Sequence, residues 1–317
     1  MDTVFRRIRQ VAVVTRDTRG SVKRFSDILG VGPWEFYDFS PTCCKHMTVD
    51  GVPTEYAMAL AVCNIGTIQF EFCEPLDDRS LYARYLIEQG EGLQHIAYEL
   101  DCGFDEAVRY FEAKGIGINQ SGDWHGCCNF NYLDSFDQLK HAAEFHNQDL
   151  DEIAKYSNYG EYPPRNLRLS GKPLLTDIVG LGIVVNDLER TLRIYEDEFG
   201  VGPWEVMEYS NQNLTHMKVH GEAVDYSYRG ATARIGDKSI ELIQPVGDNS
   251  IFAEYARISG KGEGLYSVEY KVADRDRLMA TLRDAGVAIA QSGRLNGQEV
   301  VYFNSRNTFQ HVMKIVA

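Results

Sequence analysis

The sequence lacks any apolar run that approaches the roughly 18 residues needed for a membrane-spanning helix. It is also short of basic residues, since 32 Lys and Arg stand against 46 Asp and Glu, for a net charge of −14. This balance disfavours nucleic acids and anionic membranes as partners. The first ten residues are charged and lack the apolar stretch of a signal peptide, so we expect a cytoplasmic protein.

Cysteine is missing from the second half of the chain. All seven cysteines lie in the first half, at positions 43, 44, 63, 73, 102, 127 and 128. They form two adjacent pairs and no CxxC spacing, which disfavours both a disulfide framework and a structural zinc site. We expect reduced thiols that pack as small apolar groups.

The chain contains an internal repeat. The segment Gly-Val-Gly-Pro-Trp-Glu at 30–35 returns at 200–205, a shift of 170 positions. The same shift relates Glu71 to Glu241 and His141 to His311. A register kept across half of a 317-residue chain indicates two homologous halves of about 150 residues each.

Each half reads as two similar modules, in which a strand is followed by a helix and then by several strands. The first helix is expected at 19–29, where an apolar stripe ends at Gly30 and Pro33. We therefore predict an α+β protein of four βαβββ modules. The expected division is a first domain at 1–146, an irregular linker at 147–175 and a second domain at 176–317.

Four matching strand positions distinguish the two halves, which differ at three of them and share Glu at the other. The first half has Gln10, Glu71, His95 and Glu144, and the second has Gly180, Glu241, Ser267 and Lys314. Two carboxylates, one imidazole and one amide oxygen suit a divalent metal such as Zn, Mn, Co or Ni. Alanine stands two positions from three of these residues and leaves room on the same strand face. We predict one metal ion in the first half and a degenerate, structural second half.

The order of modules resembles the vicinal oxygen chelate superfamily, which includes glyoxalases and methylmalonyl-CoA epimerases. The resemblance is carried by the Gly-Val-Gly-Pro-Trp segment, Gly-Leu-Gln-His-Ile-Ala-Tyr at 92–98, Ile-Glu-Leu-Ile-Gln-Pro at 240–245, and Tyr-Leu-Asp at 132–134 with His-Ala-Ala-Glu at 141–144. It implies that two modules pair into a cupped, incompletely closed β-barrel, with a metal held by one residue from each of four strands. The Gln/Glu/His/Glu set is similar to that of the glyoxalase I branch, whereas the epimerases more often have His where this chain has Gln10.

The pairing of modules is open at this point. Pairing within a half brings the four first-half residues together. Pairing across halves would bring His95 and Glu144 to Glu241 and Gly180, which leaves three ligands. The presence of both Gln10 and Glu71 in the first half favours pairing within it.

A metal that binds a carbonyl oxygen stabilises the enolate formed when a neighbouring carbon loses its proton. A nearby carboxylate can remove that proton, so Glu71 and Glu144 are candidate bases as well as ligands. His125, a loop histidine with no counterpart in the second half, is a third catalytic candidate. His141 and His311 recur in both halves, so a structural role is expected for them.

These features favour a metal-dependent isomerase or epimerase that acts on a small-molecule carbonyl compound. A lyase of the glyoxalase I type is a close alternative. A ring-cleaving dioxygenase is disfavoured, since such enzymes use two histidines and one carboxylate. A metal-free binding protein, as in the bleomycin-resistance branch, also stays open. The second half would stand in for a partner subunit, and either a monomer or a homodimer fits.

Overall fold

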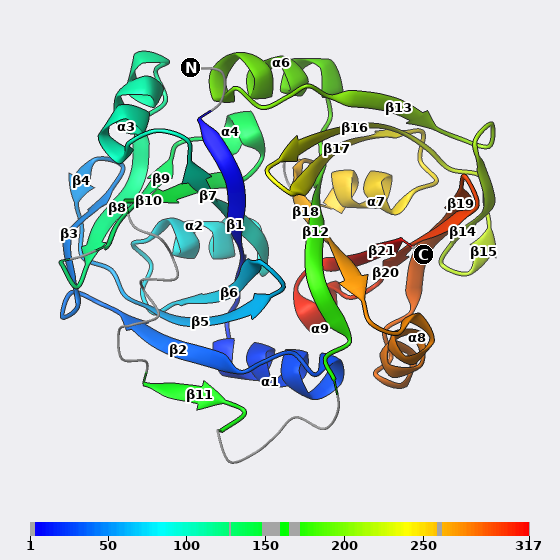
Figure 1. The fold of residues 1–317 in the computed structure, drawn as a ribbon, viewed down its shortest axis with the longest axis horizontal. Coiled ribbons are helices and arrows are strands. Elements are labelled where there is room, and N and C mark those ends of the chain that lie inside the picture. The colour runs from blue at the N-terminus through cyan, green and yellow to red at the C-terminus, as the bar shows by residue number, and fades with distance from the viewer. Residues whose placement is uncertain (1–3, 127, 148–158, 165–171, 259–261, 317) are drawn as a thin grey trace.

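The computed structural model describes residues 4–126, 128–147, 159–164, 172–258 and 262–316. Two curled β-sheets lie side by side, one built from each half of the chain (Figure 1). The strand order is β11-β2-β5-β6-β1-β7-β10-β9-β8-β3-β4 in the first sheet and β13-β16-β17-β12-β18-β21-β20-β19-β14-β15 in the second. The α+β class and the two cupped sheets are confirmed, and the modules pair within each half.

The two halves have the same sequence of elements. The first contains β1 (Phe5–Val14), α1 (Thr18–Leu29), β2 (Trp34–Phe39), β3 (Cys44–Val49), β4 (Val52–Pro53), β5 (Met58–Ile65), β6 (Ile68–Pro75), α2 (Leu81–Glu88), β7 (Gly92–Leu100), α3 (Phe104–Ala113), β8 (Ile118–Trp124), β9 (Cys128–Leu133), α4 (Phe136–Leu139) and β10 (Ala142–His146). The second contains β12 (Leu175–Val184), α6 (Leu188–Phe199), β13 (Glu205–Tyr209), β14 (Leu214–Val219), β15 (Glu222–Ala223), β16 (Ser227–Ile235), β17 (Lys238–Val246), α7 (Ile251–Ile258), β18 (Gly264–Val272), α8 (Arg275–Asp284), β19 (Ile289–Leu295), β20 (Gln298–Phe303), α9 (Arg306–Phe309) and β21 (Val312–Val316). The longest of these helices, α1 and α6, have 12 residues each, so no described helix has the length or apolar character of a membrane span.

Helix α1 shows how local sequence sets these boundaries. The Asp17 side chain caps its start by accepting a hydrogen bond from the backbone N–H of Gly20. Gly30 ends it with φ 69°, a left-handed conformation that glycine adopts without strain. Asp187 and Gly200 do the same for α6 in the second half. The predicted helix at 19–29 is thereby confirmed to within one residue.

Some elements were not predicted. The eight-residue helices α2 and α7 lie within the curve of the first and second sheet, respectively (Figure 1). The expected linker at 147–175 contains a short strand, β11 (Gly160–Tyr162), which pairs with β2 and extends the first sheet. The rest of the linker at 148–158 and 165–171 lies outside the described residues. The six described cysteines are free thiols, and Cys127 lies outside the described residues.

The sheets separate two kinds of core. Alternate residues of β1 point to opposite faces, so Val11 and Val13 pack outward while Ala12 and Val14 pack inside the first cup. The outward residues of both halves form one continuous apolar core, in which Phe25 of α1 meets Phe309 at a ring distance of 5.3 Å. The inside of each cup has its own smaller cluster. Outer faces therefore join the halves, and inner faces are left to line the cups.

The recurring histidines belong to the shared core. Tyr98 Oη lies 2.9 Å from His141 Nε2, and Tyr270 Oη lies 2.8 Å from His311 Nε2. Each Nδ1 faces a backbone carbonyl, that of Leu139 at 3.0 Å for His141. A neutral imidazole that donates from Nδ1 and accepts at Nε2 satisfies all of these contacts. Burial lowers the pKa of His141 to about 3 and that of His311 to about 4.

These two histidines predict a loss of stability in mild acid. Their folded-state pKa lies below the unfolded value near 6.5, so the folded protein binds fewer protons and its stability falls as the pH drops below 6.5. Each contributes about 2 kcal/mol of destabilisation at pH 5 relative to pH 7. We expect His311→Gln, whose side chain does not titrate, to reduce this pH-dependent loss by about 2 kcal/mol in urea unfolding measured at the two pH values. An identical loss in the variant and in the unmodified protein would contradict the prediction.

Candidate metal centre

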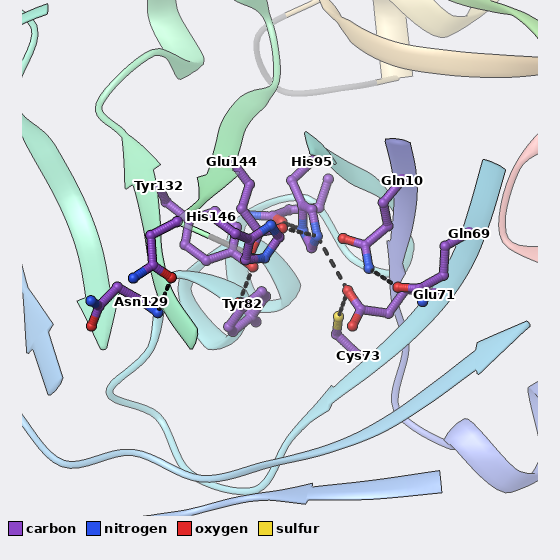
Figure 2. Close-up of polar contacts among 12 residues, drawn as sticks. Gln10, Gln69, Glu71, Cys73, Tyr82, His95, Asn129, Tyr132, Glu144 and His146 are labelled. Atoms are coloured by element: carbon purple, nitrogen blue, oxygen red, sulfur yellow. Dashed lines mark hydrogen bonds and ion pairs between the residues drawn. The ribbon is translucent and has the colours of Figure 1, made fainter. Parts of the chain in front are cut away.

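The four predicted metal ligands lie on four adjacent strands, β6, β1, β7 and β10. The strand register arranges their inward-facing residues in two neighbouring rows. One row reads Gln69, Gln10, Ala97 and Glu144, and the next reads Glu71, Ala12, His95 and Ala142. The small alanines alternate with the polar side chains, so the polar groups converge on one place inside the first cup (Figure 2).

His95 lies at the middle of this group and is fully buried. Its Nε2 atom is 3.2 Å from Glu71 Oε2 and 3.2 Å from Glu144 Oε2 (Figure 2). The other ring nitrogen, Nδ1, lies 2.6 Å from the Gln94 side-chain oxygen. This contact orients the ring so that Nε2 faces both carboxylates.

Gln10 presents its oxygen to the same place. Its Nε2 donates a hydrogen bond of 2.5 Å to Gln69 Oε1. Gln10 Oε1 is buried and has no hydrogen-bond partner. His95 Nε2 and Glu144 Oε2 face each other as an ion pair at 3.2 Å but lack a well-aligned hydrogen bond. A buried amide oxygen without a partner is costly, and its place beside this ion pair fits a further ligand. Two carboxylates, an imidazole and an amide oxygen fit a divalent metal ion.

The charges of the site are coupled. Burial alone would lower the pKa of His95, but the Glu144 and Glu71 carboxylates outweigh it and raise that pKa to about 9. Burial alone would raise the pKa of Glu144, but His146 and His95 hold it well below its usual range. The metal-free site therefore keeps a proton on His95 and a charge on Glu144, and a bound divalent ion would replace that proton.

Two neighbours of the predicted ligands were not predicted as site residues. The Cys73 thiol donates to Glu71 Oε2 at 3.1 Å, and ligand atoms of Cys73, Glu71 and His95 lie within 4.8 Å of one another. His146 Nε2 lies 3.0 Å from Glu144 Oε1. Both residues are two positions from a predicted ligand, on the same strand face. Two features of the sequence could have identified Cys73 and His146 as site residues. Their spacing of two positions puts them on the same strand face as a ligand, and the matching positions of the second half are the apolar Ile243 and Val316.

The site opens into a cavity. Its polar end carries Gln10, Gln69, Glu71, Glu144 and His146, and its walls include Tyr37, Phe39, Met58, Leu60, Val62, Tyr82, Trp124, Phe130 and Tyr132. A largely apolar pocket with a few convergent polar groups is typical of a small-molecule site.

His125 lies elsewhere. It is exposed in the turn between β8 and β9, with φ 54°, and its ring centroid is 4.8 Å from that of Trp124. It is not among the described residues that line the cavity. Asn296 occupies the corresponding turn of the second half with φ 49°. This similarity favours a turn-forming role for His125, and its catalytic role stays a prediction.

The second cup has an ammonium group in place of a metal site. Lys314 Nζ lies 2.8 Å from Glu241 Oε2 and 2.8 Å from Glu269 Oε2. Burial opposes the charge of Lys314, but the two carboxylates outweigh that effect and raise its pKa. Cβ atoms added at Gly180 and Gly182 would meet hydroxyl oxygens of neighbouring serines at 2.5 and 2.3 Å, so a larger side chain there would require those serines to move. In the described part of the second half, an ammonium group thus lies where the first cup has its candidate ligands.

The family model described as the Glyoxalase/Bleomycin resistance protein/Dioxygenase superfamily matches residues 9–126 and 181–303. The chain belongs to this superfamily. Its members are mostly enzymes and typically bind a divalent metal, and the two matched regions coincide with the two halves. No curated protein matches the chain.

Solved structures of the superfamily have a similar fold. A mutant of 4-hydroxymandelate synthase from Streptomyces coelicolor has a TM-score of 0.60 and 14% identity, covering 99% of this chain and 92% of that chain. A xylose isomerase-like TIM barrel/4-hydroxyphenylpyruvate dioxygenase fusion protein has a TM-score of 0.56 and 13% identity, covering 99% of this chain and 49% of that one. Methylmalonyl-CoA epimerase from Mycobacterium tuberculosis is 20% identical over 46% of this chain and 90% of its own, with a TM-score of 0.34. At these identities the first two similarities describe the fold alone.

Proposed function

We propose that the protein is a metal-dependent isomerase or epimerase, which moves a proton at a carbon next to a carbonyl group. The observation that carries the proposal is the convergence of Glu71, His95 and Glu144 with the unpartnered oxygen of Gln10, at the polar end of a cavity. The first cup combines these groups, while the second cup has Lys314 in their place.

The residues that would hold the metal are Gln10, Glu71, His95 and Glu144. When bound, a divalent metal supplies a Lewis acid that stabilises negative charge on a carbonyl oxygen. Glu71 on β6 and Glu144 on β10 come from the two outermost of the four strands, and both line the cavity. Either carboxylate, if substrate displaces it as a ligand, could take the proton from the carbon next to the carbonyl and return it to that carbon.

Neighbouring side chains orient the two carboxylates. His146 fixes Glu144 through Oε1, and Cys73 donates to Glu71 through Oε2. The aromatic rings of Tyr82 and Tyr132, joined by a hydrogen bond of 2.6 Å between their hydroxyl groups, pack against His95 and keep water from its buried side. Such support holds the reacting groups in one geometry.

Proton exchange into a carbonyl compound tests the proposal. We expect the metal-loaded protein to catalyse exchange of the hydrogens next to the carbonyl of a simple ketone in D2O, followed by proton NMR. Glu71→Gln and Glu144→Gln should each lower the exchange rate by about 100-fold or more, because a general base typically contributes that much. Glu241→Gln, at the position of Glu71 in the second half, is the matched control. No exchange with any divalent metal and any ketone of a broad panel would reject the proposal.

One observation favours a second candidate, a dioxygenase. His146 places a second imidazole beside Glu144, so two histidines and a carboxylate lie together although only one histidine was predicted as a ligand. This is the residue set that non-haem iron oxygenases use. Oxygen uptake by the Fe(II)-loaded protein, abolished in His146→Ala, would support this candidate. Uptake at the same rate in His146→Ala would count against it.

A further inference from the structure

The walls of the first cup differ in character from its polar end. Aromatic side chains from three strands pack together there: the ring centroids of Phe39 and Phe130 are 5.0 Å apart, and those of Tyr37 and Trp124 are 5.7 Å apart. Met58 and Leu60 of β5 extend the apolar surface. An apolar ligand body that covers these groups is favoured by about 25 cal/mol per Å² of apolar area removed from water.

Apart from the histidines of the metal centre, the charged side chains that line the cup are acidic. Glu35, Glu71 and Glu144 line the cavity, and no Lys or Arg is among the described residues that line it. Glu35 lies away from the metal centre on β2, where it accepts a hydrogen bond of 2.6 Å from Tyr37 Oη. One divalent ion would offset only two of the three carboxylates. A ligand with a phosphate or a remote carboxylate would therefore meet repulsion, without the basic side chains that usually bind such groups.

The second cup is an internal comparison. It has the same fold and register, yet Leu60 and Val62 correspond to Gly230 and Thr232. The second cup has an aromatic cluster of its own that includes Tyr209 and Tyr228, so the contrast lies in these two β5 side chains. The fold therefore does not require Leu60 and Val62, and their place in the lining of the cavity with the metal ligands points to a role in holding the substrate.

We propose that the first cup takes an uncharged, largely apolar carbonyl compound with an aromatic or similar ring system. Its carbonyl group lies at the polar end, and its ring system lies against Phe39, Leu60 and Trp124. Coenzyme A thioesters, phosphorylated compounds and sugar-like ketones are excluded, because the charge or hydroxyl groups of each would be left without partners. The position of the carbonyl group rests on the proposed function. The uncharged and apolar character of the remaining ligand rests on the residues of the cavity walls.

Binding of matched probes tests this substrate class directly. Isothermal titration calorimetry on the metal-loaded and the EDTA-treated full-length protein would compare 2-acetylnaphthalene, 6-acetyl-2-naphthoate, acetyl-coenzyme A and dihydroxyacetone. We expect the neutral naphthyl ketone to bind at least ten times more tightly than each of the other three. Equal or tighter binding of the naphthoate, the thioester or the triose would overturn the proposal.

Variants separate the effects of charge and surface. Glu35→Gln should reduce the affinity ratio between the neutral and the anionic naphthyl probes by about threefold or more, since it removes one of the like charges. An unchanged ratio would overturn the charge argument.

The double variant Leu60→Gly/Val62→Thr copies the second cup and should weaken binding of 2-acetylnaphthalene at least tenfold. Thr232→Val, at the position of Val62 in the second cup, should leave binding unchanged, and equal weakening in Thr232→Val would overturn the wall argument.

The substrate class and the proposed reaction can fail separately. Tight binding of the neutral probe without proton exchange would support the substrate class and reject the isomerase. Exchange in small ketones combined with tighter binding of the anionic probes would support the isomerase and overturn the substrate class.

Discussion

His95→Ala is expected to remove the metal from the protein. The change deletes the imidazole whose Nε2 lies 3.2 Å from both Glu71 and Glu144, and it leaves these two buried carboxylates with no positive partner between them. We expect about one equivalent of divalent metal in the unmodified protein and less than a tenth of that in the variant, measured by plasma mass spectrometry after dialysis. Glu144→Gln, which removes one carboxylate charge and keeps the shape, should lower the metal affinity about 100-fold.

The matched control is Ser267→Ala, because Ser267 occupies the position of His95 in the second cup. It should leave the metal content unchanged. Full metal content in both His95→Ala and Glu144→Gln would show that the metal lies elsewhere and would reject the assignment of all four ligands. Absence of metal from the unmodified protein would instead leave the metal-free binding protein as the better interpretation of the first cup.

Lys314→Met is expected to be the most destabilising single change in the second half. Lys314 is the cation between Glu241 and Glu269, and its removal leaves two largely buried carboxylates facing each other. Breaking such a pair from one side costs about 3–5 kcal/mol, because the remaining charge is desolvated and unpaired. Urea unfolding at pH 7 would measure the loss.

A compensated variant separates charge from packing. In Lys314→Met/Glu241→Gln/Glu269→Gln the unpaired charges are removed along with the ammonium group, so most of the lost stability should return. If the triple variant were as unstable as Lys314→Met, lost packing of the lysine chain would be the cause and the charge explanation would be wrong. A gain in affinity for divalent metal in Lys314→Met would further support the view that the ammonium group occupies the place of a metal.

The candidate ligands could be found in the sequence because the two homologous halves of the chain can be compared position by position. A buried strand position that is Gln or His in one half and Gly or Ser in the other is not required by the fold to be Gln or His. Cys73 and His146, which were not predicted, also differ from their counterparts in the second half. Their position on the same strand face as a ligand does not by itself show whether their side chains reach the site. Helices α2 and α7 escaped prediction because eight residues give too short an apolar pattern to distinguish a helix from a loop.

The sequence by itself determined the two halves, the α+β class, most strands and helices, and which half carries ligand chemistry, since these depend on local pattern and on a repeat that can be read along the chain. Only the tertiary structure decided that modules pair within a half, that His146 and Cys73 join the predicted ligands, that His125 lies outside the described cavity lining, and that Lys314 bridges two carboxylates. Each of these depends on which strands become neighbours in a sheet. Strand pairing joins residues that are far apart in sequence. It is stabilised by the packing of side chains in the outer core, which both halves share.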